Sequence, residues 1–208
     1  MGTAISRRTA RNPIVASRRD LGIDLANTVA WRGSTPSESL HTLGDLLAWL
    51  DSAKVLPARA IADLRKRFDT RPADGTAALR EAIEIREAIY RLLHAAASGS
   101  PPPADDLRRF NRALLEAAPR ESLERANGGF GWRIEVTPTA AGMLTPALWS
   151  AADVLAGPER ARLRECANER CLWLFLDDSK NGTRRWCSMQ SCGNRAKAHR
   201  HYLRRKEK

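Results

Sequence analysis

The chain has 208 residues, 43% of them hydrophobic, so it can hold one large domain or a domain with an appended module. The formal net charge of +11 lies at the ends: residues 1–20 hold five basic and one acidic side chain, residues 21–165 hold nineteen of each, and residues 166–208 hold eleven basic and four acidic ones. No apolar run is long enough to span a membrane, and basic ends favour a polyanionic partner.

Residues 1–20 are polar and basic and show no hydrophobic period, which predicts a flexible arm. Ser6-Arg7-Arg8 is similar to the start of a twin-arginine export signal, but the residues that follow are too polar and too few for the apolar region such a signal needs. We therefore expect a cytoplasmic protein whose thiols stay reduced.

Residues 21–31 predict a helix whose apolar face enters a core. A neighbouring stripe of this helix carries four side chains that can make polar contacts: Asp24, Asn27, Thr28 and Trp31. Such a stripe either ties down an adjacent loop or lines a candidate pocket for a small-molecule effector.

The central part of the chain predicts a mainly helical domain. Helices are expected over residues 43–52, after a capping box at Thr42–Asp45, and over residues 57–68, 77–97 and 104–117. Residues 123–126 and 130–136, separated by Asn127-Gly128-Gly129, predict a β-hairpin. A further helix is expected to begin at Thr145-Pro146, and a last one over residues 159–165 runs into Cys166 without a linker.

All four cysteines lie near the C-terminus, as two Cys-x4-Cys pairs: Cys166 with Cys171 and Cys187 with Cys192. Two disulfides and four independently buried thiols are alternatives. Disulfides suit small exported domains, however, and independent burial does not explain two equally spaced pairs in one segment. Two close pairs are the usual way to supply a tetrahedral zinc ion with four thiolates, so the spacing predicts one structural zinc.

Around these cysteines we expect the outline of a treble clef. The apolar run over residues 172–176 predicts a strand, Asn181-Gly182 predicts a turn, and residues 183–186 are expected to return as a second strand. From about Ser188 to about Arg205 the composition predicts a basic helix. So small a module needs the metal for much of its folding free energy.

The segment from Leu174 to Tyr202, which contains Arg184-Arg185-Trp186-Cys187 and Cys192-Gly193-Asn194-Arg195, resembles the CGNR zinc-finger family. The resemblance implies that Cys166, Cys171, Cys187 and Cys192 are the zinc ligands. It also implies an upstream ABATE domain, a domain associated with stress-induced transcription regulation, and residues 21–31 are similar to the segment with which ABATE domains start.

A basic helix braced by zinc is suited to the DNA major groove, with arginine reading guanine and the other cations holding phosphates. The predicted nucleic-acid contacts are Arg184, Arg185, Lys197, Arg200, Arg204, Arg205 and Lys206. We expect Asn194 to cap the zinc loop and to hydrogen-bond a thiolate. Arg195 either contacts DNA or braces the module by bonding a backbone carbonyl or Asp177, and we favour the structural role.

The expected fold is mainly α, of the α+β class: a basic arm (1–20), a helical domain (21–160) and a treble-clef-like zinc module (161–208) packed against it. The expected function is DNA-binding transcription regulation, with the helical domain as a sensor or as the interface of a homodimer. The alternative is a structural zinc clasp in an RNA- or protein-binding protein. No motif of catalytic groups is found, so no enzymatic activity is expected.

Overall fold

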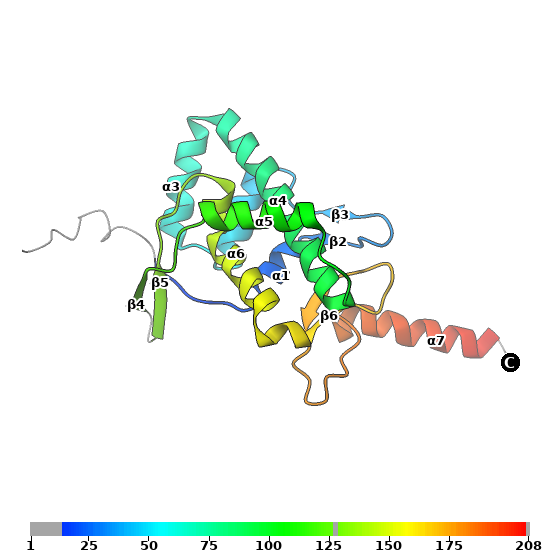
Figure 1. Cartoon of the computed structure of the whole chain (residues 1–208). Coiled ribbons are helices and arrows are strands. Elements are labelled where there is room, and N and C mark those ends of the chain that lie inside the picture. Colours follow the sequence, from blue (N-terminus) through cyan, green and yellow to red (C-terminus); the bar gives the residue numbers. More distant parts are fainter. Residues whose placement is uncertain (1–13, 127–128, 207–208) are drawn as a thin grey trace, which may run out of the picture.

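The computed structural model describes residues 14–126 and 129–206 and shows a helical domain built around two long helices (Figure 1). Helix α4 (Pro72–Ser98) and helix α6 (Ala140–Ala156) pack on each other, and α1 (Leu21–Ala26) and α5 (Ala104–Glu116) pack against both. Their apolar faces form one buried core, which confirms the mainly helical fold with small sheets.

Helix α4 is longer than expected, because it begins at Pro72 and not at residue 77. Proline suits the first helical turn, where its missing N–H has no partner to lose. Gly75 continues the helix where it crosses its neighbours: a β-carbon there would lie 2.8 Å from Leu43 Cδ2. The helix ends as the sequence indicates, at Gly99 in the left-handed conformation (φ 71°).

Helices α2 (Leu43–Ser52) and α3 (Ala58–Asp69) form a second layer on α4. The capping box predicted at the start of α2 is confirmed: the Asp45 N–H donates to Thr42 Oγ1 at 3.2 Å, and the Thr42 N–H donates to the Asp45 carboxylate at 2.8 Å. Leu46, Leu47 and Leu50 then face the core.

The predicted start of α6 at Thr145-Pro146 is wrong, because the helix begins at Ala140. Thr139 caps it by accepting a hydrogen bond from the Gly142 N–H at 3.1 Å. The added turn is fully buried, so tertiary packing stabilises it although Pro146 then lies inside the helix. Thr145 Oγ1 donates to the Ala141 carbonyl at 3.0 Å and accepts the Ala118 N–H at 3.1 Å.

The predicted hairpin is present as β4 (Ser122–Ala126) and β5 (Gly129–Arg133), but the second strand ends at Arg133 and not at residue 136. Residues 127 and 128 of the predicted turn lie outside the described residues. A third strand, β1 (Ile14–Val15), pairs antiparallel with β5, so Val15 lies opposite Trp132. The predicted flexible arm therefore extends too far: residues 14–20 are part of the fold, and residues 1–13 lie outside the described residues. The helix predicted over residues 21–31 is too long: α1 ends at Ala26, and a separate strand pair, β2 (Val29–Ala30) and β3 (Ser37–Glu38), follows it.

The C-terminal module differs from the expected hairpin. The predicted helix over residues 159–165 is a 3-10 turn (Pro158–Arg162) followed by strand β6 (Leu163–Glu165), and β6 pairs with β7 (Leu174–Leu176). Residues 183–186 form no strand, because the Asp177 carboxylate accepts the N–H groups of Ser179 and Arg184 and closes the intervening loop. Leu163, Leu174 and Leu176 enter the main core.

A π-turn (Met189–Gly193) leads into helix α7 (Asn194–Lys206), which confirms a basic helix at this position. In Figure 1 α7 points away from the helical domain. Among the described residues, no helix combines the length and the apolarity that crossing a membrane requires.

Candidate zinc centre and its attachment

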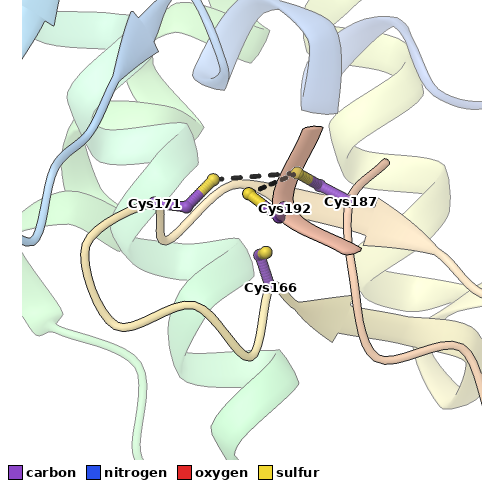
Figure 2. Close-up of side chains that lie close together, drawn as sticks. All are labelled: Cys166, Cys171, Cys187 and Cys192. Carbon is purple, nitrogen blue, oxygen red and sulfur yellow. Dashed lines mark hydrogen bonds between the residues drawn. The ribbon is translucent and has the colours of Figure 1, made fainter. Parts of the chain in front are cut away.

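The four cysteine side chains converge from two loops (Figure 2). Cys166 follows β6 directly, Cys171 closes a tight turn before β7, Cys187 precedes the π-turn, and Cys192 lies within it. Their sulfur atoms all lie within 4.8 Å of one another, with Cys171 and Cys187 at 3.7 Å and Cys187 and Cys192 at 3.8 Å.

These distances fit a single zinc ion. A tetrahedral zinc with thiolate ligands at about 2.3 Å holds its sulfur atoms about 3.8 Å apart, close to the observed spacings and far longer than a disulfide bond. All four thiols are unpaired, which contradicts the disulfide alternative. The centre is a four-thiolate site for one structural zinc, as the spacing predicted.

The proton chemistry of the cluster also calls for a cation. Hydrogen bonds from Cys171 and Cys187 lower the pKa of Cys166, and their bonds to Cys166 raise the pKa of Cys171 and of Cys187. Without a metal, the sulfurs share protons because neighbouring thiolates repel each other. A bound divalent cation takes the place of those protons and stabilises four thiolates together.

Asn168, between the first pair of cysteines, performs the role that the sequence assigned to Asn194. Its Nδ2 donates to Cys192 Sγ at 3.5 Å, and its backbone carbonyl accepts the Cys171 N–H at 2.7 Å. Asn194 instead donates to the Gln190 carbonyl at 3.2 Å, so its predicted bond to a thiolate is wrong. The turn-forming character of asparagine within Cys-Ala-Asn-Glu-Arg-Cys was the available signal.

Arg195 braces the module by a different contact from the one predicted. Its guanidinium lies 4.4 Å from the centre of the Trp31 ring, a cation–π contact between α7 and the helical domain. The Asp177 carboxylate, its proposed partner, accepts hydrogen bonds from Ser179 and Arg184, and the bonds from Ser179 lower the pKa of Asp177 most. Helix α7 is therefore anchored at its first turn.

Helix α1 and the segment that follows it clasp the zinc module. Asn27 makes two hydrogen bonds with Leu174: its Nδ2 donates to the carbonyl at 2.9 Å, and its Oδ1 accepts the N–H at 3.0 Å. Trp173 Nε1 donates to the Val29 carbonyl at 3.0 Å. Trp31 packs against the cysteine cluster. The module is thus fixed on the helical domain.

Gly33 brings the backbone of this clasp against the first cysteine loop. Its N–H donates to the Arg170 carbonyl at 3.2 Å. A β-carbon at Gly33 would lie 1.8 Å from the backbone carbonyl oxygen of Glu169, which is too close for any side chain.

Gly33→Ala is therefore expected to displace the Cys166–Cys171 loop and destabilise the protein by about 1–3 kcal/mol, with weaker zinc binding. Thermal unfolding of the zinc-loaded protein and a zinc competition titration measure the two effects. The matched control is Gly44→Ala in α2, where the new β-carbon meets only Thr42 Oγ1 at 3.4 Å. Equal stability of the two variants would contradict the assigned contact.

The candidate effector residues separate into two groups. Asp24 and Asn27 line a cavity of about 270 Å³ between α1 and the zinc module. Thr28 and Trp31 are not among its lining residues. Thr28 is buried, and its hydroxyl donates to the Leu25 carbonyl at 2.8 Å. The Trp31 ring makes the cation–π contact with Arg195. The structural interpretation of the stripe explains Asn27, Thr28 and Trp31, and an effector in the cavity stays a prediction.

The side chains predicted to contact nucleic acid differ in their exposure and in their contacts within the protein. Lys197, Arg205 and Lys206 are exposed on α7, whereas the side chains of Arg200 and Arg204 lie outside the described residues. The Arg184 guanidinium donates to the carbonyls of Trp186 and Cys187 and lies 4.4 Å from the Phe175 ring centre. It therefore has its partners within the zinc module. Arg185 is exposed beside Trp186.

The sequence did not predict a buried ionic cluster that lies between α4 and the segment after α1. Arg86 on α4 is 2% exposed and bonds both Glu38 oxygens at 2.6 and 2.7 Å. The Glu87 carboxylate accepts hydrogen bonds from both Arg86 and Arg32. The Arg32 guanidinium lies 3.9 Å from the Tyr90 ring centre. Tyr90, in turn, donates to the Leu172 carbonyl in the first cysteine loop at 3.3 Å. Arginine on a helix gives no sequence signal of burial.

A helical domain joined to a four-cysteine metal centre and a projecting basic helix defines a zinc-finger protein with an N-terminal helical domain. The ABATE family, described as "Putative stress-induced transcription regulator", matches residues 19–158, and the CGNR zinc finger matches residues 162–205. The first match covers more than half of the chain, so the protein belongs to the ABATE family and carries a CGNR zinc finger. A comparison with curated proteins found no match.

Proposed function

We propose that the protein is a cytoplasmic DNA-binding transcription regulator that contacts nucleic acid through α7. The observation that carries the proposal is the position of this helix. It begins two residues after the zinc ligand Cys192 and projects from the body (Figure 1). Its exposed cations include Lys197, Arg205 and Lys206. The description of the ABATE family supports a regulatory role.

The zinc centre and Trp31 give α7 a defined direction, which a groove-binding helix needs because its side chains must reach the bases in a fixed register. Exposed lysine and arginine supply the phosphate contacts that dominate affinity. In this proposal the helical domain acts as a sensor of an effector or forms the interface of a homodimer. The cavity lined by Asp24 and Asn27 supports the sensor role. No catalytic step belongs to the proposed function.

The test removes three exposed charges from α7 with Lys197→Ala, Arg205→Ala and Lys206→Ala together. Fluorescence anisotropy with duplex DNA, at several salt concentrations, should show weaker binding and a log–log salt slope smaller by about 2–3, because each phosphate contact contributes about 0.9. The zinc content should not change.

The matched control replaces Arg65, Lys66 and Arg67, three exposed cations on α3, by alanine. Its net charge equals that of the α7 variant, so a general charge effect would weaken both equally and contradict the assignment to α7. A chain that binds single-stranded RNA but not duplex DNA would favour the alternative of a structural clasp in an RNA-binding protein.

A further inference from the structure

Of the four cysteines, Cys187 is the least buried. Cys166, Cys171 and Cys192 are 2–4% exposed, whereas Cys187 is partly exposed. Cys187 is also the one cysteine that lines the cavity of about 270 Å³ between α1 and the zinc module. A reagent that enters this cavity therefore reaches Cys187 before the other three cysteines.

The cavity suits a small neutral oxidant. Its walls combine ionic groups, among them Arg19, Asp24 and Arg184, with aromatic side chains such as Phe175. Hydrogen peroxide is uncharged, so the mixed charges do not repel it, and it is far smaller than the space. Arg184 donates a hydrogen bond to the Cys187 carbonyl and places a positive charge beside this cysteine. Partial exposure is one condition for the oxidation of a cysteine, because the oxidant must reach its sulfur atom.

Two other cysteines lie close enough to Cys187 to form a disulfide with it after a small movement. Cys171 and Cys192 lie at nearly the same distance from Cys187, 3.7 and 3.8 Å between sulfur atoms. Both of these sulfur atoms accept a hydrogen bond, Cys192 from Asn168 Nδ2 and Cys171 from the Trp173 backbone N–H, so hydrogen bonding does not favour either as the nucleophile. Cys171 is the nearer sulfur atom and is assigned as the attacking thiol. Its sulfur must approach that of Cys187 by about 1.7 Å to reach the length of a disulfide bond.

We propose that the zinc centre is an oxidation site for hydrogen peroxide, which reacts first with Cys187, and that Cys171 then closes a disulfide. The Cys187 thiolate attacks the peroxide: a sulfur–oxygen bond forms, the oxygen–oxygen bond breaks, and hydroxide leaves. The Cys171 thiolate then attacks the Cys187 sulfur, a disulfide forms, and the oxygen departs as a second hydroxide. Two thiolates have lost two electrons and one peroxide has gained them.

The consequence is loss of the metal and release of α7. With a disulfide between Cys171 and Cys187, the site keeps two thiolates of its four ligands, too few to hold zinc. Cys192 then no longer fixes the π-turn from which α7 begins. The inference rests on the zinc centre and not on nucleic-acid binding, so it can fail while the proposed function holds.

The experiment treats the zinc-loaded full chain with hydrogen peroxide and follows released zinc with a colorimetric chelator. Peptide mass spectrometry then locates the disulfide. We expect release of the bound zinc with formation of a Cys171–Cys187 disulfide, reversed by dithiothreitol and added zinc. Retention of zinc, or a disulfide that joins other cysteine pairs instead, would overturn the proposal.

Two matched variants test the entry point, because a histidine can replace one thiolate in a structural zinc site. Cys187→His removes the proposed entry thiol, and Cys166→His keeps both reacting thiols. Peroxide-driven release from Cys187→His should be slower than from Cys166→His by about tenfold or more. Equal rates would overturn the assignment.

A measurement on the unmodified chain covers the case in which a variant does not bind zinc. Brief treatment of the zinc-loaded protein with N-ethylmaleimide, followed by mass spectrometry, should label Cys187 first. Labelling that begins at another cysteine, or at all four together, would contradict the access route.

Discussion

Removing the zinc ion is expected to melt α7 and both cysteine loops while the core around α4 and α6 stays folded. Helix α7 has 13 residues, a length at which an isolated helix is marginal in water. The tertiary contact described for its first turn is that of Arg195 with Trp31. Structural zinc contributes roughly 10–16 kcal/mol of binding free energy in zinc-finger peptides, so no other interaction of the module is comparable.

Circular dichroism at 222 nm and limited trypsin digestion measure this effect. After treatment with a strong chelator, the helical signal should fall by the share that α7 contributes, and cleavage after Arg195 and Lys197 should become fast. Added zinc should reverse both changes. Strands β6 and β7 should resist the chelator, since Leu163 and Leu174 belong to the main core. Unchanged protection of α7 without zinc would contradict the role assigned to the metal.

Arg86→Met is expected to destabilise the protein by about 3–5 kcal/mol, because removing one member of a buried ion pair leaves its partners without compensation. Arg86 bonds Glu38, Glu87 and Thr28, which come from three segments of the helical domain. The measurement is urea unfolding followed by tryptophan fluorescence. Arg80→Met, an exposed arginine on the same helix, is the control and should change stability by less than about 0.5 kcal/mol.

The same cluster gives stability a dependence on pH. Burial alone would raise the pKa of Glu38, but hydrogen bonds from Arg86 and from the Leu40 and Ser39 N–H groups outweigh it and lower the pKa. The pKa of Glu87 is also lowered, because Arg32 and Arg86 outweigh its burial. A lowered carboxyl pKa adds stability above the unfolded value of about 4.3, and this stability is lost as the pH falls through the folded pKa values.

Unfolding free energies measured between about pH 7 and pH 3 should therefore decline on the acid side, and less steeply in Glu38→Gln than in the wild type. A double-mutant cycle between Arg86→Met and Glu38→Gln should show strong coupling. Additive effects of the two substitutions would contradict the pairing seen in the structure.

The zinc ligands could be read from the chain because their signal is local. Two Cys-x4-Cys pairs bring four thiolates together whatever surrounds them, and the capping box at Thr42 and the glycine after α4 likewise depend on neighbours in sequence. The start of α6 was misjudged for the same reason. Proline is a local signal of a first turn, whereas the burial of residues 140–144 is a tertiary effect that outweighs it.

The attachment of the zinc module has no local signal. Asn27 and Leu174 are 147 residues apart, and an asparagine near a helix end gives no indication of which distant strand it will bond. The pairing of β7 with β6, in place of a hairpin with residues 183–186, was decided by the fit of Leu163, Leu174 and Leu176 into the main core and by the bonds of Asp177. Composition and spacing therefore determine a zinc-dependent module with a basic helix. The attachment of that module to the helical domain, and the position of Cys187 at the cavity beside α1, follow from long-range packing.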